Sequence, residues 1–336
     1  MRNRQLQKRY TLPEFLNYGR DLNASDPLDR IYALLGMPAF ATVKPFSVNY
    51  NLSRAEVYRD LAERCILELP GLDILSAVSH IEEIFEGFPS WVPQWDQKGS
   101  KNFINICTSF SWKASGETNV SAAIGNPTSI LKIDGITFDT VDTYSKIDVS
   151  KWFDLANHIM ERHPVLECWL SQRVNPTVYP TGEAFMEVYA MVLVVGLSSD
   201  HGKTVDERES LLSDFAAYIV QLLKVAKQET HQYPELLEVA GSVMWEVYET
   251  MANDTCVHRA LFTTKRGYLG LGPELLQPGD VVSVLYGGKV PYILRPKDGH
   301  YLLVGDAYVH GIMDGEAVQQ CRDGDSSIEE KVFEIH

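Results

Sequence analysis

The clearest structural pattern in this chain lies in residues 258–317, HRALFTTKRGYLGLGPELLQPGDVVSVLYGGKVPYILRPKDGHYLLVGDAYVHGIMDGEA. Short runs of β-branched and aromatic residues alternate here with clusters of glycine, proline and aspartate, which is typical of consecutive antiparallel strands joined by tight turns. The pattern predicts strands at about 258–264, 267–271, 280–286, 290–295 and 300–309. Five short strands must curl to bury one face, so we expect a small antiparallel β-barrel or rolled sheet.

The rest of the chain predicts an α+β fold in four parts. Residues 1–87 have a helical pattern, and a capping box of Ser53 and Glu56 begins a helix that runs to about Leu69. Residues 88–149 predict a second β region, with a hairpin that turns at Asp134 and Gly135. Residues 150–254 predict a helical insertion with helices near 151–171, 183–196, 205–228 and 235–252. Residues 255–336 form the C-terminal β module, and their last dozen residues predict a final strand or a loose tail.

Four segments of this sequence carry a family resemblance. They are DPLDRIYALLGM (26–37), FPSWVPQWD (88–96), GYLGLGPELLQPGDVVSVLYGGKVPYILRP (267–296) and YLLVGDAYVHGIMDGEA (301–317). In this order they resemble fungal heterokaryon-incompatibility (HET) proteins over nearly the whole chain. The resemblance marks the following residues as family hallmarks with expected structural roles: Asp26, Pro27, Asp29, Arg30, Trp91, Pro93, Trp95, Asp96, Gly267, Gly270, Gly272, Pro278, Gly279, Asp280, Gly305, His310 and Gly311.

Two of these hallmark segments also allow local predictions from chemistry. Asp26 can cap a short helix with Pro27 at its first position, and Asp29 and Arg30 can form an ion pair or fixed polar contacts. Trp91 and Trp95 lie in a segment that two prolines exclude from a regular helix. We expect the two indoles to fill the interior between neighbouring layers, each N–H bonded to a carbonyl; the alternative is that they stack on a ligand.

Composition limits the partners that the chain can have. The formal net charge is −15, with 45 acidic and 30 basic residues, which argues against binding to nucleic acid or to an anionic membrane. The longest apolar run, residues 189–197, is too short to cross a bilayer. The five cysteines (65, 107, 168, 256 and 321) contain no C-x-x-C pair, as expected of a protein from a reducing compartment. We therefore predict a cytoplasmic protein with neither disulfides nor a metal site.

A nucleotide cofactor is also not expected. Residues 196–204 end in Gly-Lys-Thr like a phosphate-binding loop, but five residues separate the two glycines instead of the required four. An extra residue changes the cradle of backbone N–H groups that holds the phosphate. Gly267, Gly270 and Gly272 lack the dinucleotide-binding spacing and precede no helix, so we expect them to permit strand bending and close backbone approach.

The candidates for acid–base chemistry lie on the last predicted strand of the β module. Strict alternation would place Asp306, Tyr308 and His310 on one face, where a carboxylate, a phenol and an imidazole can act together. His258 and Arg259, on the first strand, are candidates for the same face. We expect structural roles instead, with Asp306 accepting hydrogen bonds from turn N–H groups and His310 fully hydrogen-bonded. No residue is assigned as catalytic.

The family resemblance implies a function in non-self recognition and regulated cell death. In HET proteins the effector domain precedes the segment that matches residues 26–37, and about 25 residues before Asp26 are too few to form a domain. We therefore expect a non-enzymatic regulatory or interaction region whose partner is another protein or the HET domain. The alternative is a repurposed enzyme that binds a small apolar metabolite in a cleft between the β regions and the helices.

Overall fold

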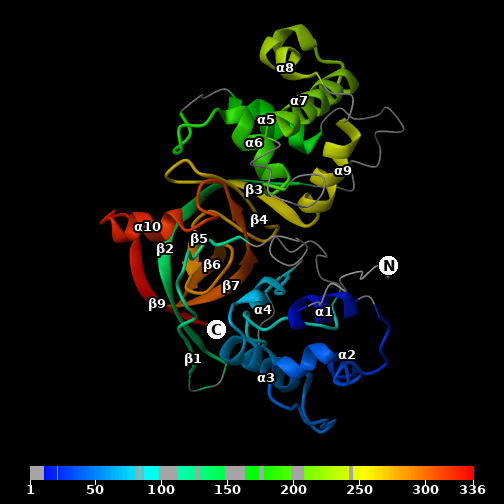
Figure 1. Cartoon of the computed structure of the whole chain (residues 1–336), viewed down its shortest axis with the longest axis vertical. Helices are drawn as coiled ribbons and strands as arrows, with labels where there is room; N and C mark the ends of the chain where they lie inside the picture. Colours follow the sequence, from blue (N-terminus) through cyan, green and yellow to red (C-terminus); the bar gives the residue numbers. More distant parts are fainter. Residues whose placement is uncertain are drawn as a thin grey trace, which may run out of the picture.

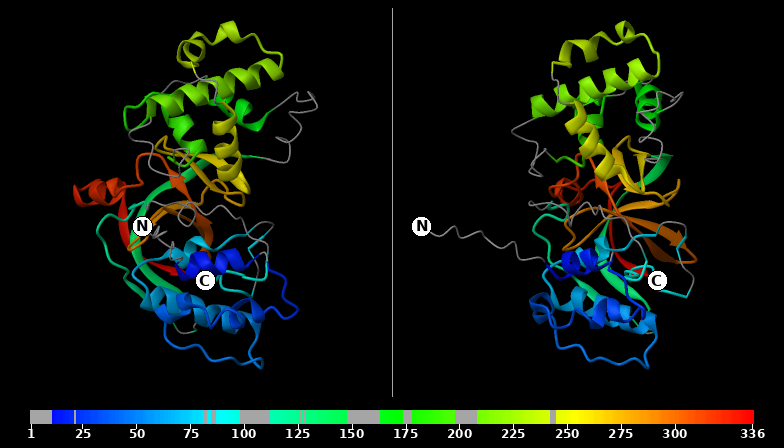
Figure 2. Two further views of the ribbon diagram at one scale, coloured as in Figure 1. Left: turned by 45° about the vertical axis from the view of Figure 1, so that its right-hand side comes forward. Right: turned by 90° about the vertical axis from the view of Figure 1, so that its right-hand side faces the viewer.

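The computed structural model describes residues 11–20, 22–80, 83–84, 87–97, 112–125, 127, 129–147, 163–173, 178–197, 208–241 and 245–336. Three layers follow one another along the long axis of the molecule (Figure 1): the helices of residues 12–76, then a β-sheet, then the helices of residues 164–256. Two rotated views show the same order (Figure 2). The α+β class is therefore confirmed. No helix in the described part of the chain is long and apolar enough to cross a membrane.

The first layer is built from short helices around one long helix. The helices are α1 (Leu12–Gly19), α2 (Asp29–Tyr32), the 3₁₀ helix η1 (Pro38–Thr42), α3 (Arg54–Glu68) and α4 (Asp73–Ser76). The predicted capping box begins α3: the Ser53 side chain accepts a hydrogen bond from the Glu56 N–H, and Glu56 accepts one from the Ser53 N–H. The buried face of α3 contains Val57, Tyr58, Leu61, Ala62, Cys65 and Ile66.

The predicted helix after Asp26 is reduced to the single turn of α2. Asp26 Oδ1 accepts a hydrogen bond from the Leu28 N–H at 2.9 Å, but the residue that precedes α2 is Leu28 and no side chain caps this helix, so the predicted cap is not formed. Asp29 and Arg30 make separate polar contacts instead of an ion pair with each other. The Tyr50 hydroxyl donates to Asp29 at 2.7 Å, and Arg30 donates to backbone carbonyls near the end of α1, including that of Arg20 at 2.9 Å.

The two hallmark tryptophans lie in the interior, next to the C-terminal end of the chain. Trp91 is fully buried and its indole N–H donates to the Ser129 carbonyl at 2.9 Å. Trp95 is equally buried, and the guanidinium of Arg20 lies 4.7 Å from the centre of its ring. Its indole nitrogen has no hydrogen-bond partner among the described residues, so the expected carbonyl is found for Trp91 alone. Ser90, which directly precedes Trp91, links this segment to the end of the chain, because its N–H donates to the His336 carbonyl at 2.9 Å.

The sheet of the second layer contains strands from two distant parts of the sequence. The strands are β1 (Ala122–Ile124), β2 (Leu131–Lys146), β3 (Arg259–Thr264), β4 (Leu269–Pro273), β5 (Val281–Leu285), β6 (Tyr292–Lys297), β7 (His300–Asp306), β8 (Tyr308–Val309) and β9 (Glu329–Ile335). The pairing order is β5-β6-β7-β9-β2-β3-β4-β8, and β2 also pairs with β5. Five strands therefore form a closed ring of pairings, in which all neighbours are antiparallel except β7 and β9. The predicted second β region thus belongs to the same sheet as the C-terminal strands.

The hairpin predicted at Asp134 and Gly135 is wrong. Both residues lie inside the continuous strand β2, where Gly135 pairs with Lys331 of β9 and also with Leu285 of β5. A Cβ atom at Gly135 would lie 2.6 Å from the Val284 carbonyl oxygen, so glycine here permits a close approach of two strands. Asp-Gly is a turn signal only where the chain leaves the sheet, and strand pairing on both sides prevents that here.

The third layer is a group of helices around buried aromatic rings. The helices are α5 (Pro164–Arg173), α6 (Phe185–Leu193), α7 (Arg208–Val225), the 3₁₀ helix η4 (Thr230–Gln232), α8 (Pro234–Val239) and α9 (Trp245–Cys256), and α10 (Glu316–Arg322) packs beside the sheet. Trp169, Tyr189 and Phe215 contact one another with ring centres 5.5–6.0 Å apart. Helices α6 and α9 contact β4 and β3, so this layer lies directly on the sheet. Residues 198–204, which resemble a phosphate-binding loop, lie outside the described residues.

Candidate functional site

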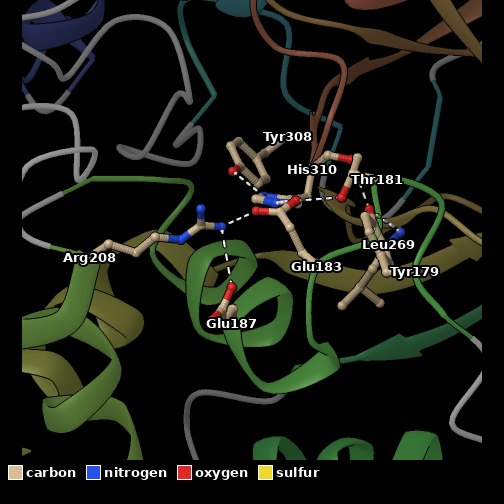
Figure 3. Close-up of polar contacts among 8 residues, drawn as sticks. All are labelled: Tyr179, Thr181, Glu183, Glu187, Arg208, Leu269, Tyr308 and His310. Atoms are coloured by element: carbon tan, nitrogen blue, oxygen red, sulfur yellow. Dashed lines mark hydrogen bonds and ion pairs between the residues drawn. The ribbon is translucent and has the colours of Figure 1, made fainter.

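The candidate site is a chain of hydrogen bonds between the sheet and the third layer (Figure 3). His310 follows β8, and its Nε2 lies 2.8 Å from Oε2 of Glu183, which precedes α6. The other ring nitrogen, Nδ1, lies 3.0 Å from the hydroxyl of Tyr308 on β8. Arg208, the first residue of α7, forms a short ion pair with Glu183, and Thr181 also donates to that carboxylate. The site therefore joins three segments of the chain that are far apart in sequence.

The protonation state of His310 follows from its surroundings. Burial lowers the pKa of His310 below its usual value, and the neighbouring Glu183 carboxylate opposes this shift only in part. At neutral pH the imidazole is therefore uncharged. Its Nε2 carries the proton and donates to Glu183, whereas Nδ1 accepts from the Tyr308 hydroxyl. Burial also raises the pKa of Tyr308 well above its ordinary value, so the phenol keeps its proton.

Glu183 is the charged member of this chain. Burial alone would raise its pKa, but hydrogen bonds from Thr181 and Arg208, together with the contact to His310, outweigh burial and hold the pKa at about 2. The carboxylate is therefore ionised over the whole physiological range. A carboxylate, an imidazole and a hydroxyl in series are the groups of an acid–base relay, and the same bonds also fasten the third layer to the sheet.

A cavity of about 320 Å³ lies next to this chain, and we name it the Tyr308 cavity. It is lined by Trp112, Thr181, Glu183, Met191, Gly196, Arg208, Tyr308, His310, Gly311, Met313, Asp314 and Glu316. Aromatic and thioether side chains form one part of its wall, and ionisable side chains form the other. Such a combination of apolar wall and convergent polar groups is typical of small-molecule sites.

Three further cavities of the described structure have comparable size but a different chemistry. One of about 470 Å³ beside Phe88 and His336 is shallow, and one of about 270 Å³ beside Cys168 is lined mainly by hydroxyl and apolar groups. A third, of about 290 Å³, is mostly apolar with the Asp73–Lys289 ion pair at its edge. The Tyr308 cavity differs because its ionisable groups are hydrogen-bonded in series, so it is the candidate site.

The prediction that Asp306 shares a face with Tyr308 and His310 is wrong. Asp306 is buried against Arg259, which donates to Asp306 Oδ1 and to the Asp306 carbonyl, each at 2.7 Å. The strand is interrupted at Ala307, because β7 pairs with β6 whereas β8 pairs with β4. Alternation therefore does not continue from Asp306 to Tyr308. Asp306 pairs with a guanidinium, whereas we expected turn N–H groups as its partners.

The Asp306 pair encloses almost no free space. The cavity beside Asp306 and Arg259 measures about 20 Å³, enough for about one water molecule. His258 lines the same small space from the surface, with its Nδ1 at 3.4 Å from Glu274 Oε2. Asp306, Arg259 and His258 thus lie together, and they are separate from Tyr308 and His310.

The remaining hallmark residues occupy turns and packed positions. Gly270 and Gly272 on β4 lie under the ring of Phe262, where a Cβ atom would be only 2.5 Å and 3.1 Å from the ring carbons. Asp280 is buried, and Arg295 donates to both of its oxygens at 2.9 Å. Asp96 pairs with Arg54. Gly267, Gly279 and Gly311 lie in turns or loops with positive φ, and Gly305 has a positive φ inside β7. Pro93 and Pro278 lie in loops.

Sequence reasoning did not find Glu183, Arg208 or Thr181. All three belong to the segment predicted as a helical insertion, and no local spacing links them to Tyr308 or His310. The sequence shows only an acidic residue just before a helix and a basic residue in the first turn of the next, which are common features. Only the packing of the third layer on β4 brings them to His310.

Comparisons with known proteins agree with the family resemblance. Residues 203–326 match the Het-6 beta-barrel domain family, a span that begins ahead of the predicted C-terminal module. The chain is 26% identical to heterokaryon incompatibility protein 6 (OR allele) of Neurospora crassa over 339 aligned residues, which cover 86% of this chain and 48% of the relative. The chain thus spans about half the length of this relative. No solved structure matches the chain. The predicted resemblance to fungal heterokaryon-incompatibility proteins is confirmed.

Proposed function

We propose that this chain, as a fungal heterokaryon-incompatibility-type protein, serves as a non-enzymatic interaction region in non-self recognition. In this role it would hold a protein partner or another domain of the same protein, and so control a response that leads to regulated cell death. The wider role comes from the family. The interaction role rests on the surface of the first layer.

The observation that carries this proposal is the position of the exposed apolar side chains. Seven of the eleven large hydrophobic residues exposed in the described structure lie within the first layer: Tyr18, Leu22, Met37, Val48, Tyr50, Leu52 and Leu67. Their exposed fractions range from 38% to 58%. Soluble proteins rarely gather apolar side chains on one part of their surface without a partner that covers them. We choose three of these residues, Met37, Val48 and Leu52, for substitution and name them the apolar test set.

The polar groups of the described structure support the same proposal. Both ring nitrogens of His310 are hydrogen-bonded within the protein, and Asp306 is paired with Arg259 beside a very small cavity. Groups that are already satisfied in this way stabilise a scaffold.

The proposal can be tested with the complete protein in fungal cells that undergo the incompatibility reaction. A variant with Met37→Ser, Val48→Ser and Leu52→Ser should fold normally and lose the response, because the partner would no longer bind. A matched control carries Val332→Ser and Leu237→Ser, which are exposed to 56% and 46% but lie outside the first layer. The control should respond like the unaltered protein. An unimpaired response of the first variant would contradict the proposal.

A second candidate function is an enzyme that acts on a small molecule in the Tyr308 cavity. The relay of Glu183, His310 and Tyr308 beside a cavity of about 320 Å³ favours it. The conservative variant Tyr308→Phe separates the two functions, because it removes the hydroxyl but keeps the ring that packs on Trp112. Loss of the response in this variant, with normal folding and an unimpaired response of the apolar test set variant, would contradict the interaction region and favour a function of the Tyr308 cavity.

A further inference from the structure

The wall of the Tyr308 cavity has an excess of negative charge. Its described lining residues include three carboxylates, those of Glu183, Asp314 and Glu316, and one guanidinium, that of Arg208. The guanidinium is already neutralised, because it pairs with Glu183 and lies 3.8 Å from a second carboxylate, that of Glu187. The field inside the cavity therefore favours a cation over an anion.

The hydrogen-bonding groups of the wall lead to the same preference. The Tyr308 hydroxyl uses its proton to donate to His310 Nδ1, so its oxygen keeps a lone pair that can accept a further bond. The carboxylate of Glu316, in the first turn of α10, accepts from the Asp314 N–H with one oxygen and has a second oxygen that can accept. Both groups therefore present an oxygen atom that can accept a hydrogen bond. They suit a ligand whose N–H groups donate hydrogen bonds.

The apolar part of the wall also suits a cation that carries a hydrocarbon body. The rings of Trp112 and Tyr308 meet edge to face with their centres 5.6 Å apart, and the thioethers of Met191 and Met313 line the same cavity. Aromatic faces attract ammonium groups, and flexible thioethers adapt to the shape of an apolar ligand.

We propose that the Tyr308 cavity binds a small primary ammonium ion with an apolar body. The ammonium group donates to Tyr308 and to Glu316, and the apolar body packs against Trp112 and the two methionines. This site goes beyond the function proposed above, because an interaction surface on the first layer does not require it. The two proposals also fail separately, since one concerns the helices of the first layer and the other concerns a cavity lined by residues of the third layer and of the segment after β8.

The experiment is calorimetric titration of the full chain with three probes of nearly equal shape. The probes are phenethylammonium, the neutral 2-phenylethanol and the anionic phenylacetate. Phenethylammonium should bind at least about tenfold more tightly than the alcohol, because a hydrogen bond between an ammonium group and a carboxylate is stronger than one from a neutral hydroxyl. Phenylacetate should bind most weakly. Absence of phenethylammonium binding, equal binding of ammonium and alcohol, or tighter binding of phenylacetate would overturn the proposal.

Two variants locate the binding to this cavity. Glu316 is exposed, so Glu316→Gln should fold normally and weaken phenethylammonium binding about tenfold, with no change for the alcohol. Tyr308→Phe should weaken ammonium binding by a smaller factor. The matched control is Glu329→Gln on β9, where the carboxylate is 70% exposed and lies outside the cavity. If Glu316→Gln binds phenethylammonium as tightly as Glu329→Gln does, the site is not the Tyr308 cavity and the proposal fails.

Discussion

His310 Nε2 donates to Glu183 Oε2 across 2.8 Å, although 127 residues separate them in the sequence. One partner follows a strand of the sheet and the other precedes a helix of the third layer. The bond therefore joins two layers of the molecule, and it does so with a neutral imidazole and an ionised carboxylate. Whatever the cavity beside it binds, this bond contributes to the packing of the helices on the sheet.

The first prediction concerns this link. Glu183→Gln removes the charge that accepts from His310 and Arg208, so the free energy of unfolding should fall by about 2 kcal/mol. The matched control is Glu187→Gln, because Glu187 is near the same guanidinium but at 3.8 Å and is more exposed. The control should lose less than about 0.5 kcal/mol. Urea denaturation at pH 7 measures both, and equal losses would show that the link to His310 adds no stability.

The second prediction concerns acid stability. Burial lowers the pKa of His163 from 6.5 to about 4, so between these values the unfolded chain binds the proton that the folded chain does not. The neutral, buried His163 therefore favours the folded state fully above pH 6.5, and this advantage is lost as the pH falls to 4. The resulting decrease in the free energy of unfolding is about 3 kcal/mol.

A variant identifies the His163 contribution. His163→Leu should lose less stability than the unaltered protein between pH 7 and pH 4.5, although the lowered pKa values of the buried His80 and His310 leave part of the acid sensitivity in place. His231→Leu, at a side chain that is 76% exposed, should leave the pH profile unchanged. Denaturation curves at several pH values decide this, and an unaltered profile for His163→Leu would contradict it.

The third prediction concerns the close packing of β4. In Gly270→Ala the new methyl group would meet the Phe262 ring at 2.5 Å and the Tyr308 carbonyl oxygen at 2.7 Å. Overpacking of this kind should lower the free energy of unfolding by about 3 kcal/mol. Adding Phe262→Leu should recover part of the loss, because it removes the ring but not the carbonyl. Gly36→Ala, where no atom lies within 4 Å of the new methyl group, serves as the control in thermal unfolding.

The fourth prediction concerns the buried pair of Asp306 and Arg259, which are 2% and 4% exposed. Asp306→Asn leaves a buried guanidinium without its countercharge, and the free energy of unfolding should fall by about 3–5 kcal/mol. Asp325→Asn breaks a pair with Arg266 in which the side chains are 28% and 30% exposed, and it should lower the free energy of unfolding far less than Asp306→Asn does. A small loss for Asp306→Asn in chemical denaturation would mean that the pair is dispensable.

The predictions from sequence succeeded where a signal lies within a few neighbouring residues. The capping box of Ser53 and Glu56 begins α3, and the strands between residues 259 and 306 lie close to their predicted positions. The segment predicted as one helix at 235–252 is instead two, α8 and α9, with different bounds. Helix periodicity shows which residues are apolar, but not where packing against neighbours interrupts a helix.

Two predictions failed because strand pairing outweighed a local signal. Asp134 and Gly135 would form a turn in isolation, but two neighbouring strands hold them inside β2. Alternation would place Asp306 beside Tyr308, but the chain changes partners at Ala307. A sequence read alone does not contain the pairing partners of its strands.

Residue spacing alone was enough to predict the α+β class, the family resemblance, the long helix of the first layer and most of the C-terminal strands, because each of these depends on neighbours within one helical turn or one strand. The contacts of Glu183 and Arg208 with His310, and the separation of Asp306 from Tyr308, follow from the folded arrangement. Hydrogen bonds and ion pairs depend on distance in space, and the packing of helices on a sheet brings together groups that no local pattern connects.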